Sequence, residues 1–188
     1  IRLFYQEKQG VSAARNLGLL NSNGKYVFYL DSDNTWKKDY LKNMIVNMEL
    51  ENLEACYSAM NIVNDNMHLI GYSGRNFDWD SCWRANFIDL NSFAHSQDFI
   101  KHGHFFDKSL KRLVDWDFIL SITSNSNTKY APFLGVNYYD GAKGNRITTT
   151  EYNNENEIEN IVYKIRSKHK HGMKKYNFLI EKWLTGNC

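Results

Sequence analysis

The sequence contains no apolar run long enough to cross a membrane, and it has a single proline among 188 residues. Its longest hydrophobic stretches are the length of a strand, whereas a membrane-spanning helix needs about 20 apolar residues. The mean hydropathy of −0.58 agrees with this pattern. We therefore predict a soluble protein located in the cytoplasm.

Neither sign of charge dominates, because 23 Lys and Arg residues face 21 Asp and Glu residues. A formal charge of +2 gives no overall field that would hold a nucleic-acid backbone, so we predict no nucleic-acid partner. The three cysteines, Cys56, Cys82 and Cys188, are widely spaced and form no CxxC pair. This usage predicts reduced thiols in the cytoplasm rather than a disulfide framework.

The sequence also lacks an initiator methionine and a secretory signal. We expect it to be part of a longer polypeptide, with an upstream portion that acts together with it. The hydrophobic fraction of 43% and the aromatic fraction of 15% are enough to fill one core. We therefore expect one globular unit.

Hydrophobic periodicity predicts alternating helices and strands, the pattern of an α/β fold. Leu41, Met44, Ile45 and Met48 recur at helical spacing and predict an amphipathic helix over about 38–50. The short apolar run at 25–30 predicts a buried strand. The other expected elements are a strand over 1–5, a helix after Gly10 capped by Ser12, a hairpin of 55–63 and 67–72, strands over 87–95 and 130–138, a helix over 115–123 and a C-terminal helix around 158–165.

An acidic turn, Asp31-Ser32-Asp33-Asn34, follows the apolar run at 25–30. Because side chains alternate along a strand, we expect Asp31 and Asp33 to project the same way, with their Cα atoms about 6 to 7 Å apart. Ligands of open α/β sheets bind beyond the carboxyl ends of strands. Mg²⁺ or Mn²⁺ binds one or two carboxylates together with substrate phosphates. The turn therefore predicts a metal-bound diphosphate, with a solvated turn or helix cap as the alternative.

Two pairs of motifs resemble one enzyme family. Gln6-Glu-Lys-Gln-Gly-Val-Ser-Ala-Ala-Arg-Asn16 and Gly24-Lys-Tyr-Val-Phe-Tyr-Leu-Asp-Ser-Asp33 resemble the helix start and the Asp-x-Asp motif of inverting, nucleotide-sugar-dependent glycosyltransferases of family 2. Phe106-Asp-Lys-Ser-Leu110 and Leu113-Val-Asp-Trp-Asp-Phe118 resemble the family's Phe-Asp-Glu-x-Leu and Glu-Asp-x-(Asp/Glu)-Leu segments. The motifs occur in the family's order and span residue 6 to about residue 122.

This resemblance implies the GT-A fold, a three-layer α/β/α sandwich with a mixed sheet, here without its N-terminal part. Residues 1–150 would be the C-terminal portion of the catalytic domain, which carries the metal, diphosphate and acceptor sides. Residues 151–188 would be a C-terminal helical extension. The base-binding half of the nucleotide site would then lie upstream of Ile1.

The resemblance also assigns roles to individual residues. Asp115 would be the general base that takes the proton of an acceptor hydroxyl. Asp117 is expected to cap its helix. The expected metal ligands are Asp33 and Asp31, and the expected contacts to the nucleotide sugar are Gly10, Arg15, Asp31, Ser32, Lys143 and Arg146, the last two from a flexible lid over 139–148. Trp116 and His95 are expected on the acceptor side.

The predicted function is thus an inverting, Mn²⁺- or Mg²⁺-dependent transfer of a sugar from a nucleotide-diphosphate sugar, with UDP-sugars as the family's usual donors. The acceptor would be a hydroxyl on a glycan, a lipid-linked precursor or a cell-surface polysaccharide precursor. The basic run over 164–175 predicts a solvated helix face, with anionic lipid at the inner face of the membrane as the alternative.

Two other functions stay open at this point. A catalytically degenerate module that binds nucleotide sugar within a larger synthase is suggested by Val114, which stands where the family has an acid. A phosphatase of the haloacid dehalogenase type is suggested by Asp31-Ser32-Asp33-Asn34-Thr35, which also resembles the Asp-x-Asp-x-Thr motif of that group, whose first acid is the nucleophile.

Overall fold

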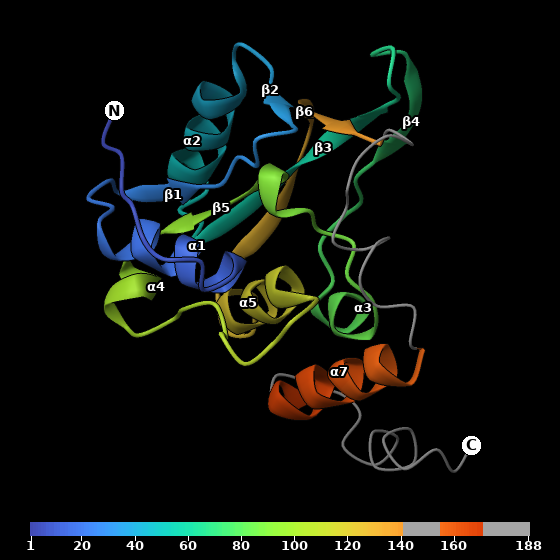
Figure 1. The fold of residues 1–188 in the computed structure, drawn as a ribbon. Coiled ribbons are helices and arrows are strands. Elements are labelled where there is room, and N and C mark those ends of the chain that lie inside the picture. Colours follow the sequence, from blue (N-terminus) through green and yellow to red (C-terminus); the bar gives the residue numbers. More distant parts are fainter. Residues whose placement is uncertain (141–154, 171–188) are drawn as a thin grey trace.

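The computed structural model describes residues 1–140 and 155–170 as a mixed sheet with helices on both faces (Figure 1). The strands follow the order β1-β5-β3-β6-β2, and β4 pairs with β3 beyond the end of β5. Only β3 and β6 are parallel, while the other described pairs are antiparallel. The strands are β1 (Tyr26–Phe28), β2 (Thr35–Trp36), β3 (Ala55–Val63), β4 (Leu69–Ser73), β5 (Phe93–Ser96) and β6 (Thr128–Tyr139).

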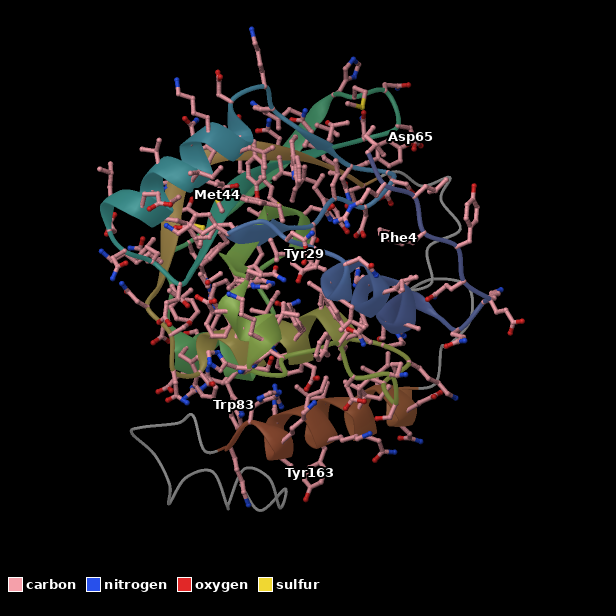
Figure 2. All side chains as sticks on the ribbon, turned by 90° about the vertical axis from the view of Figure 1, so that its left-hand side faces the viewer. Phe4, Tyr29, Met44, Asp65, Trp83 and Tyr163 are labelled. Carbon is pink, nitrogen blue, oxygen red and sulfur yellow. The ribbon has the colours of Figure 1, made fainter. Side chains whose placement is uncertain are left out.

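Two hydrophobic cores lie on opposite faces of this sheet, which makes the fold three layers deep. The smaller core packs Met44 and Met48 of α2 (Tyr40–Leu50) against β3 and β6. Figure 2 shows Met44 on the sheet-facing side of α2. The larger core lies under the other helices, which are α1 (Val11–Leu20), α3 (Trp79–Arg84), α4 (Asp98–Lys101), α5 (Val114–Thr123) and α7 (Glu155–Lys168).

The C-terminal helix α7 packs below α5 and α3 in Figure 1. Ile165 is fully buried in the larger core, and Trp83 of α3 donates its indole N–H to the carbonyl of Arg166 at 3.1 Å. Tyr163 projects to solvent from the opposite side of the helix (Figure 2). The helix predicted around 158–165 is therefore present, whereas the proposed domain division at residue 150 stays a prediction.

The expected hairpin and the helices over 38–50 and 115–123 are confirmed within a few residues. The strand expected over 87–95 is wrong in its first half, because 90–92 form a 3₁₀ turn, η1 (Leu90–Ser92), before β5 begins. The strand expected over 1–5 is also wrong: this segment is irregular and exposed. The apolar pattern suggested a strand there, but this segment pairs with none of the strands that the structure describes.

Two of the three cysteines, Cys56 and Cys82, are free and buried, and burial raises the pKa of each thiol to about 12. Both therefore stay protonated and unreactive near neutral pH. Cys188 lies outside the described residues. In the part of the chain that the structure describes, no helix combines the length and hydropathy needed to cross a bilayer.

Gly135 of β6 lies against Tyr40 of α2. A Cβ at this position would lie 2.4 Å from Cδ2 of Tyr40 and 2.8 Å from Oγ of Ser58. Both neighbours are buried, so neither can move away easily. We expect Gly135→Ala to lower the free energy of unfolding by about 1–3 kcal/mol, measured by urea denaturation.

Gly18→Ala is the matched control for this substitution. Gly18 is exposed on α1, and a Cβ there would meet nothing within 4 Å. The control should gain about 0.5–1 kcal/mol from helix propensity. Equal stability of the two variants would show that β6 and α2 are not closely packed at Gly135.

Candidate active site

The motif on α1 is tied to the segment at 106–107 by side-chain hydrogen bonds. The Asn16 amide donates to the carbonyl of Phe106 at 2.9 Å and accepts from its N–H at 2.9 Å. Ser12 donates its hydroxyl to the carbonyl of Asp107 at 3.2 Å. These two side chains are four residues apart and therefore share one face of the helix. The motif thus joins two segments about 90 residues apart in sequence.

The N-cap of α1 is Gly10, with φ of 87°, a conformation that favours glycine. No side chain caps the helix. Ser12 was predicted as the cap, and this prediction is wrong, because the hydroxyl is committed to Asp107 inside the fold. Contact between Gly10 and a nucleotide stays a prediction.

Arg15, next to Asn16 in the motif, points to the acidic turn instead. Its Nη2 lies 3.0 Å from Oδ1 of Asp31. The guanidinium also lies over the ring of Phe106, 5.4 Å from its centroid. The Arg15 side chain is only 18% exposed, while that of Asp31 is 46% exposed. The arginine is therefore held in place, and the carboxylate it binds remains accessible to a ligand.

The acidic residues lie in a turn rather than at the tip of a strand. β1 ends at Phe28, and the N–H of Asn34 donates to the carbonyl of Asp31 at 3.2 Å, which closes the turn. The argument from strand alternation therefore fails for Asp31 and Asp33. Ser32 and Asp33 are exposed, and Asp33 accepts a hydrogen bond from the Asn34 amide at 3.1 Å.

Asp115 is the second residue of α5, two positions after a strained residue. Leu113, the N-cap, is left-handed with φ of 58°, a conformation that costs a non-glycine residue about 1–3 kcal/mol. Burial raises the pKa of the half-buried Asp115, the positive charge of Arg15 opposes this rise, and the negative charge of Asp31 adds to it. Asp115 therefore lies in the electrostatic field of the Arg15–Asp31 pair.

Two further polar residues, Asp89 and Asn91, complete this cluster, and the sequence analysis missed both. The Asn91 side chain bridges Asp31 and Asp89. Burial raises the pKa of Asp89 to about 6; its hydrogen bonds from Asn91 oppose this, and the charges of Asp115 and Asp31 add to it. The available signal was three polar residues, at 89, 91 and 92, that interrupt the apolar segment 87–94. We call Arg15, Asp31, Asp89, Asn91 and Asp115 the acidic cluster.

Two predicted acceptor-side residues are buried, so those predictions are wrong. Trp116 is 2% exposed and donates its indole N–H to the carbonyl of Cys82 at 2.7 Å. His95 is fully buried between the hydroxyl of Tyr29 at 2.7 Å and the carbonyl of Ser96 at 2.8 Å. Burial lowers the pKa of His95 to about 4, so the ring is neutral near pH 7. Both side chains belong to the core.

Asp117 does not cap α5 as predicted. Its carboxylate is 1% exposed and contacts Nζ of Lys168 at 2.8 Å and Nε2 of His169 at 2.8 Å. Lys168 also lies 3.3 Å from Asp107. Asp117 therefore connects α5 to the end of α7 and does not belong to the acidic cluster. The predicted lid residues Lys143 and Arg146 lie outside the described residues.

The chemistry of the donor atoms fits a divalent cation held jointly with a substrate. Within residues 1–140 and 155–170, no group of three or more His, Cys, Asp or Glu side chains is placed to hold a metal ion. Mg²⁺ and Mn²⁺ sites of phosphate-transferring enzymes need only one or two carboxylates, because the substrate supplies other ligands. Asp33 is exposed at the turn, and the carboxylates of the acidic cluster outnumber its one guanidinium.

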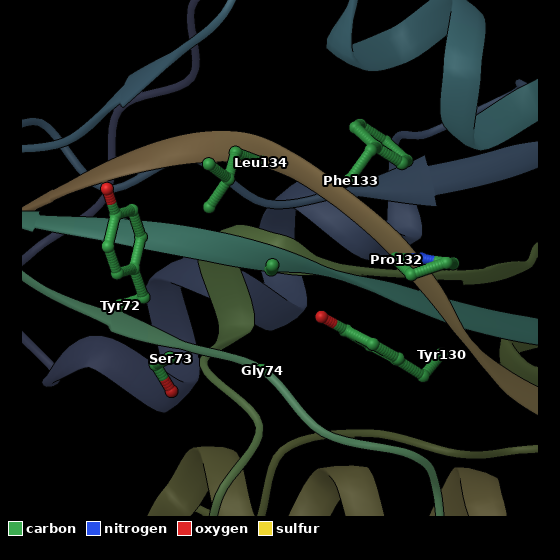
Figure 3. Close-up of a pocket in the computed structure, with 8 residues that line it drawn as sticks. Tyr72, Ser73, Gly74, Tyr130, Pro132, Phe133 and Leu134 are labelled. Atoms are coloured by element: carbon green, nitrogen blue, oxygen red, sulfur yellow. The ribbon is translucent and has the colours of Figure 1, made fainter.

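A separate cavity of about 290 Å³ lies between β3, β4 and β6, where three extra residues of β6 interrupt its pairing with β3 (Figure 3). Tyr72 and Tyr130 border it, and no residue of the acidic cluster lines it. The cavity therefore lies apart from the groups that could carry out chemistry.

Comparison with known proteins gives a consistent result. The family model described as "Glycosyl transferase family 2" matches residues 1–112, which ends just before Asp115. An uncharacterized glycosyltransferase of Rickettsia felis is 37% identical over 65 residues, 35% of this chain and 11% of its own length. Glycosyltransferase GlyA of Streptococcus pneumoniae is 47% identical over 45 residues, 23% of this chain and 6% of its own length.

Solved structures resemble the whole described fold. The crystal structure of Staphylococcus aureus TarS 1-349 in complex with UDP-GlcNAc superposes with a TM-score of 0.69 and 16% sequence identity, over 95% of this chain and 52% of the TarS chain. The predicted GT-A fold is thereby confirmed. The chain spans about half of that TarS structure and about a tenth of the Rickettsia felis protein. The phosphatase hypothesis is not supported by this fold.

Proposed function

Because this chain belongs to glycosyl transferase family 2, we propose that the intact protein transfers a sugar from a nucleotide-diphosphate sugar to an acceptor hydroxyl with inversion of the anomeric carbon. A UDP-sugar is the proposed donor, since the TarS structure of the same fold contains UDP-GlcNAc. The proposed acceptor is a glycan, a lipid-linked precursor or a cell-surface polysaccharide precursor, reached from the cytoplasm.

The observation that carries this proposal is the placement of Asp115 in the field of the Arg15–Asp31 ion pair. Asp31, 46% exposed, and Asp33 at the exposed turn would hold the metal, with Arg15 and Ser32 beside the nucleotide. Mn²⁺ or Mg²⁺ bound there supplies positive charge that stabilises the departing diphosphate. Asp115 takes the proton of the acceptor hydroxyl as its oxygen attacks the sugar.

Asp33→Asn tests the metal assignment. The intact protein is supplied with a panel of sugar nucleotides and Mn²⁺, and the release of nucleoside diphosphate is measured with and without acceptor extracts. We expect release by the wild-type protein to need Mn²⁺. In Asp33→Asn the rate of release should fall at least about 100-fold, because one charged metal ligand is replaced by a neutral amide. Asp39→Asn, at an exposed position before α2 where its side chain makes no capping bond, is the matched control.

The outcomes separate the hypotheses. Metal-independent release, or full activity of Asp33→Asn, would contradict the assignment of the turn. UDP binding without release from any donor would favour the catalytically degenerate module. Val114, which motivated that alternative, is buried in the larger core, where an acidic side chain would be unfavourable.

A further inference from the structure

Asn91 uses every polar group it has. Its side-chain Oδ1 accepts the backbone N–H of Asp31 at 2.7 Å. Its Nδ2 donates to Oδ2 of Asp31 at 3.3 Å and to Oδ1 of Asp89 at 2.9 Å. Its backbone N–H donates to Asp89 at 2.8 Å, and its carbonyl accepts from the indole of Trp36 at 2.9 Å. The residue is 1% exposed, so water does not compete for these bonds.

We propose that Asn91 is a positioning residue that fixes the carboxylate of Asp31 toward the donor site, and that Asp89 holds the Asn91 amide in the orientation this requires. The proposal rests on the function proposed above. The Asn91 amide contacts both the backbone N–H and the carboxylate of Asp31. Because one amide holds both the backbone and the side chain of Asp31, few rotamers remain open to this side chain.

The two oxygens of Asp31 are held by different partners. Oδ1 is bound by Arg15 at 3.0 Å and Oδ2 by Asn91. The carboxylate is therefore hydrogen-bonded by α1 on one side and by η1 on the other, yet its side chain remains 46% exposed. Such an arrangement leaves lone pairs for a ligand while removing the entropy cost of orienting the side chain on binding.

Asp89 explains why the amide points this way round. An amide exposes two N–H donors at one end and an oxygen at the other. With carboxylates of Asp31 and Asp89 on one side and the N–H of Asp31 on the other, only one orientation satisfies all partners. The same NH₂ group separates two carboxylates that would otherwise repel each other, and burial of Asp89 adds to the cost of any rearrangement.

Bonds that fold η1 do not require this side-chain contact. Two of these hydrogen bonds use only the backbone of residue 91: its carbonyl accepts from the Trp36 indole, and its N–H donates to Asp89. In a third, the Ser92 hydroxyl donates to the carbonyl of Asp89. A substitution at 91 therefore keeps these bonds and removes mainly the side-chain hydrogen bonds to Asp31. This separation makes the proposal testable.

The test uses Asn91→Leu in the intact protein, because leucine has a similar size but neither the two donors nor the oxygen that accepts the N–H of Asp31. We expect the backbone amide of Asp31 to exchange with deuterium at least about 10-fold faster, as measured by mass spectrometry of the peptide covering 29–33 without ligand. We also expect kcat/KM for UDP-GlcNAc, or for the donor found active in the panel, to fall about 10- to 100-fold.

Asp89 variants separate its hydrogen-bonding role from its charge. Asp89→Leu removes the acceptor and should reproduce the loss of kcat/KM seen in Asn91→Leu. Asp89→Asn retains an oxygen that accepts from Asn91, so its kcat/KM should fall less. Met48→Ala, in the other core, should lower the melting temperature while kcat/KM is unchanged at 15 °C. If Asn91→Leu does not fold, Asn91→Ser takes its place.

Two results would overturn the proposal: unchanged exchange at Asp31 in the Asn91 variants, or equal losses of kcat/KM in Met48→Ala and Asn91→Leu at matched stability. Failure of the proposed function is distinguishable, because exchange at Asp31 is measured without substrate. Absence of wild-type turnover with every donor, together with faster exchange in Asn91→Leu, would support the positioning contact and reject the sugar transfer.

Discussion

Replacing Asp115 with asparagine is expected to lower kcat for sugar transfer by about 10³-fold while UDP binding with Mn²⁺ changes less than about threefold. General-base catalysis contributes about 10²- to 10⁴-fold, and asparagine keeps the shape of the side chain but cannot take a proton. Turnover with a saturating donor and acceptor gives kcat, and titration calorimetry gives the affinity for UDP. Asp98→Asn, an exposed carboxylate paired with Lys101, is the matched control.

The pH dependence of the same step follows from the electrostatics of Asp115. Only the ionised carboxylate acts as a base, so activity falls as the pH drops through the pKa of Asp115. Burial raises this pKa and the charge of Arg15 opposes the rise. The acidic limb of the rate profile should therefore lie above that of an exposed aspartate, and Arg15→Met should move it to still higher pH. Full activity of Asp115→Asn would reject the assignment of the base.

Replacing both partners of Asp117, with Lys168→Met and His169→Leu together, is expected to lower the free energy of unfolding by about 3–5 kcal/mol. The Asp117 carboxylate is 1% exposed and would lose the two side chains that hold it at 2.8 Å. A buried charge left without a partner is strongly destabilising. Urea denaturation measures the lost stability. Faster proteolytic cleavage within 155–170 would show that α7 no longer packs against α5.

Two further variants make this test specific. Lys164→Met changes an exposed lysine of the same helix, which contacts the hydroxyl of Ser109, and should alter stability by less than about 0.5 kcal/mol. Adding Asp117→Leu to the double variant should recover much of the lost stability, since apolar residues of similar size often replace a buried ion pair without cost. Failure of this third change to restore stability would show that packing of α7, rather than the unpaired charge, is responsible.

The sequence was most informative where several motifs agreed. The order of the motifs predicted the family and the fold, because several separate motifs occur in the order that the family has. It failed where one residue type serves several purposes. Trp116 and His95 look like ligand-binding side chains, yet burial and hydrogen bonding make them part of the core.

Contacts between distant residues were the second limit. Asp89 and Asn91 lie about 60 residues from Asp31, and nothing in their local pattern indicates that an amide would bridge two carboxylates. Likewise, Asp117 is matched with Lys168 and His169 only after the chain has folded. Local periodicity predicts elements and faces, whereas these pairings depend on how the layers pack together.

The short helix α5 carries Asp115 and Asp117 two residues apart, which places them on different sides of its axis. The two aspartates therefore have different surroundings, since Asp117 is buried against Lys168 and His169 and Asp115 lies beside the Arg15–Asp31 pair. Under the proposed function, only the loss of Asp115 would remove the base. A related sequence that keeps this aspartate but replaces Asp117 and both of its partners with apolar residues should therefore retain the proposed chemistry.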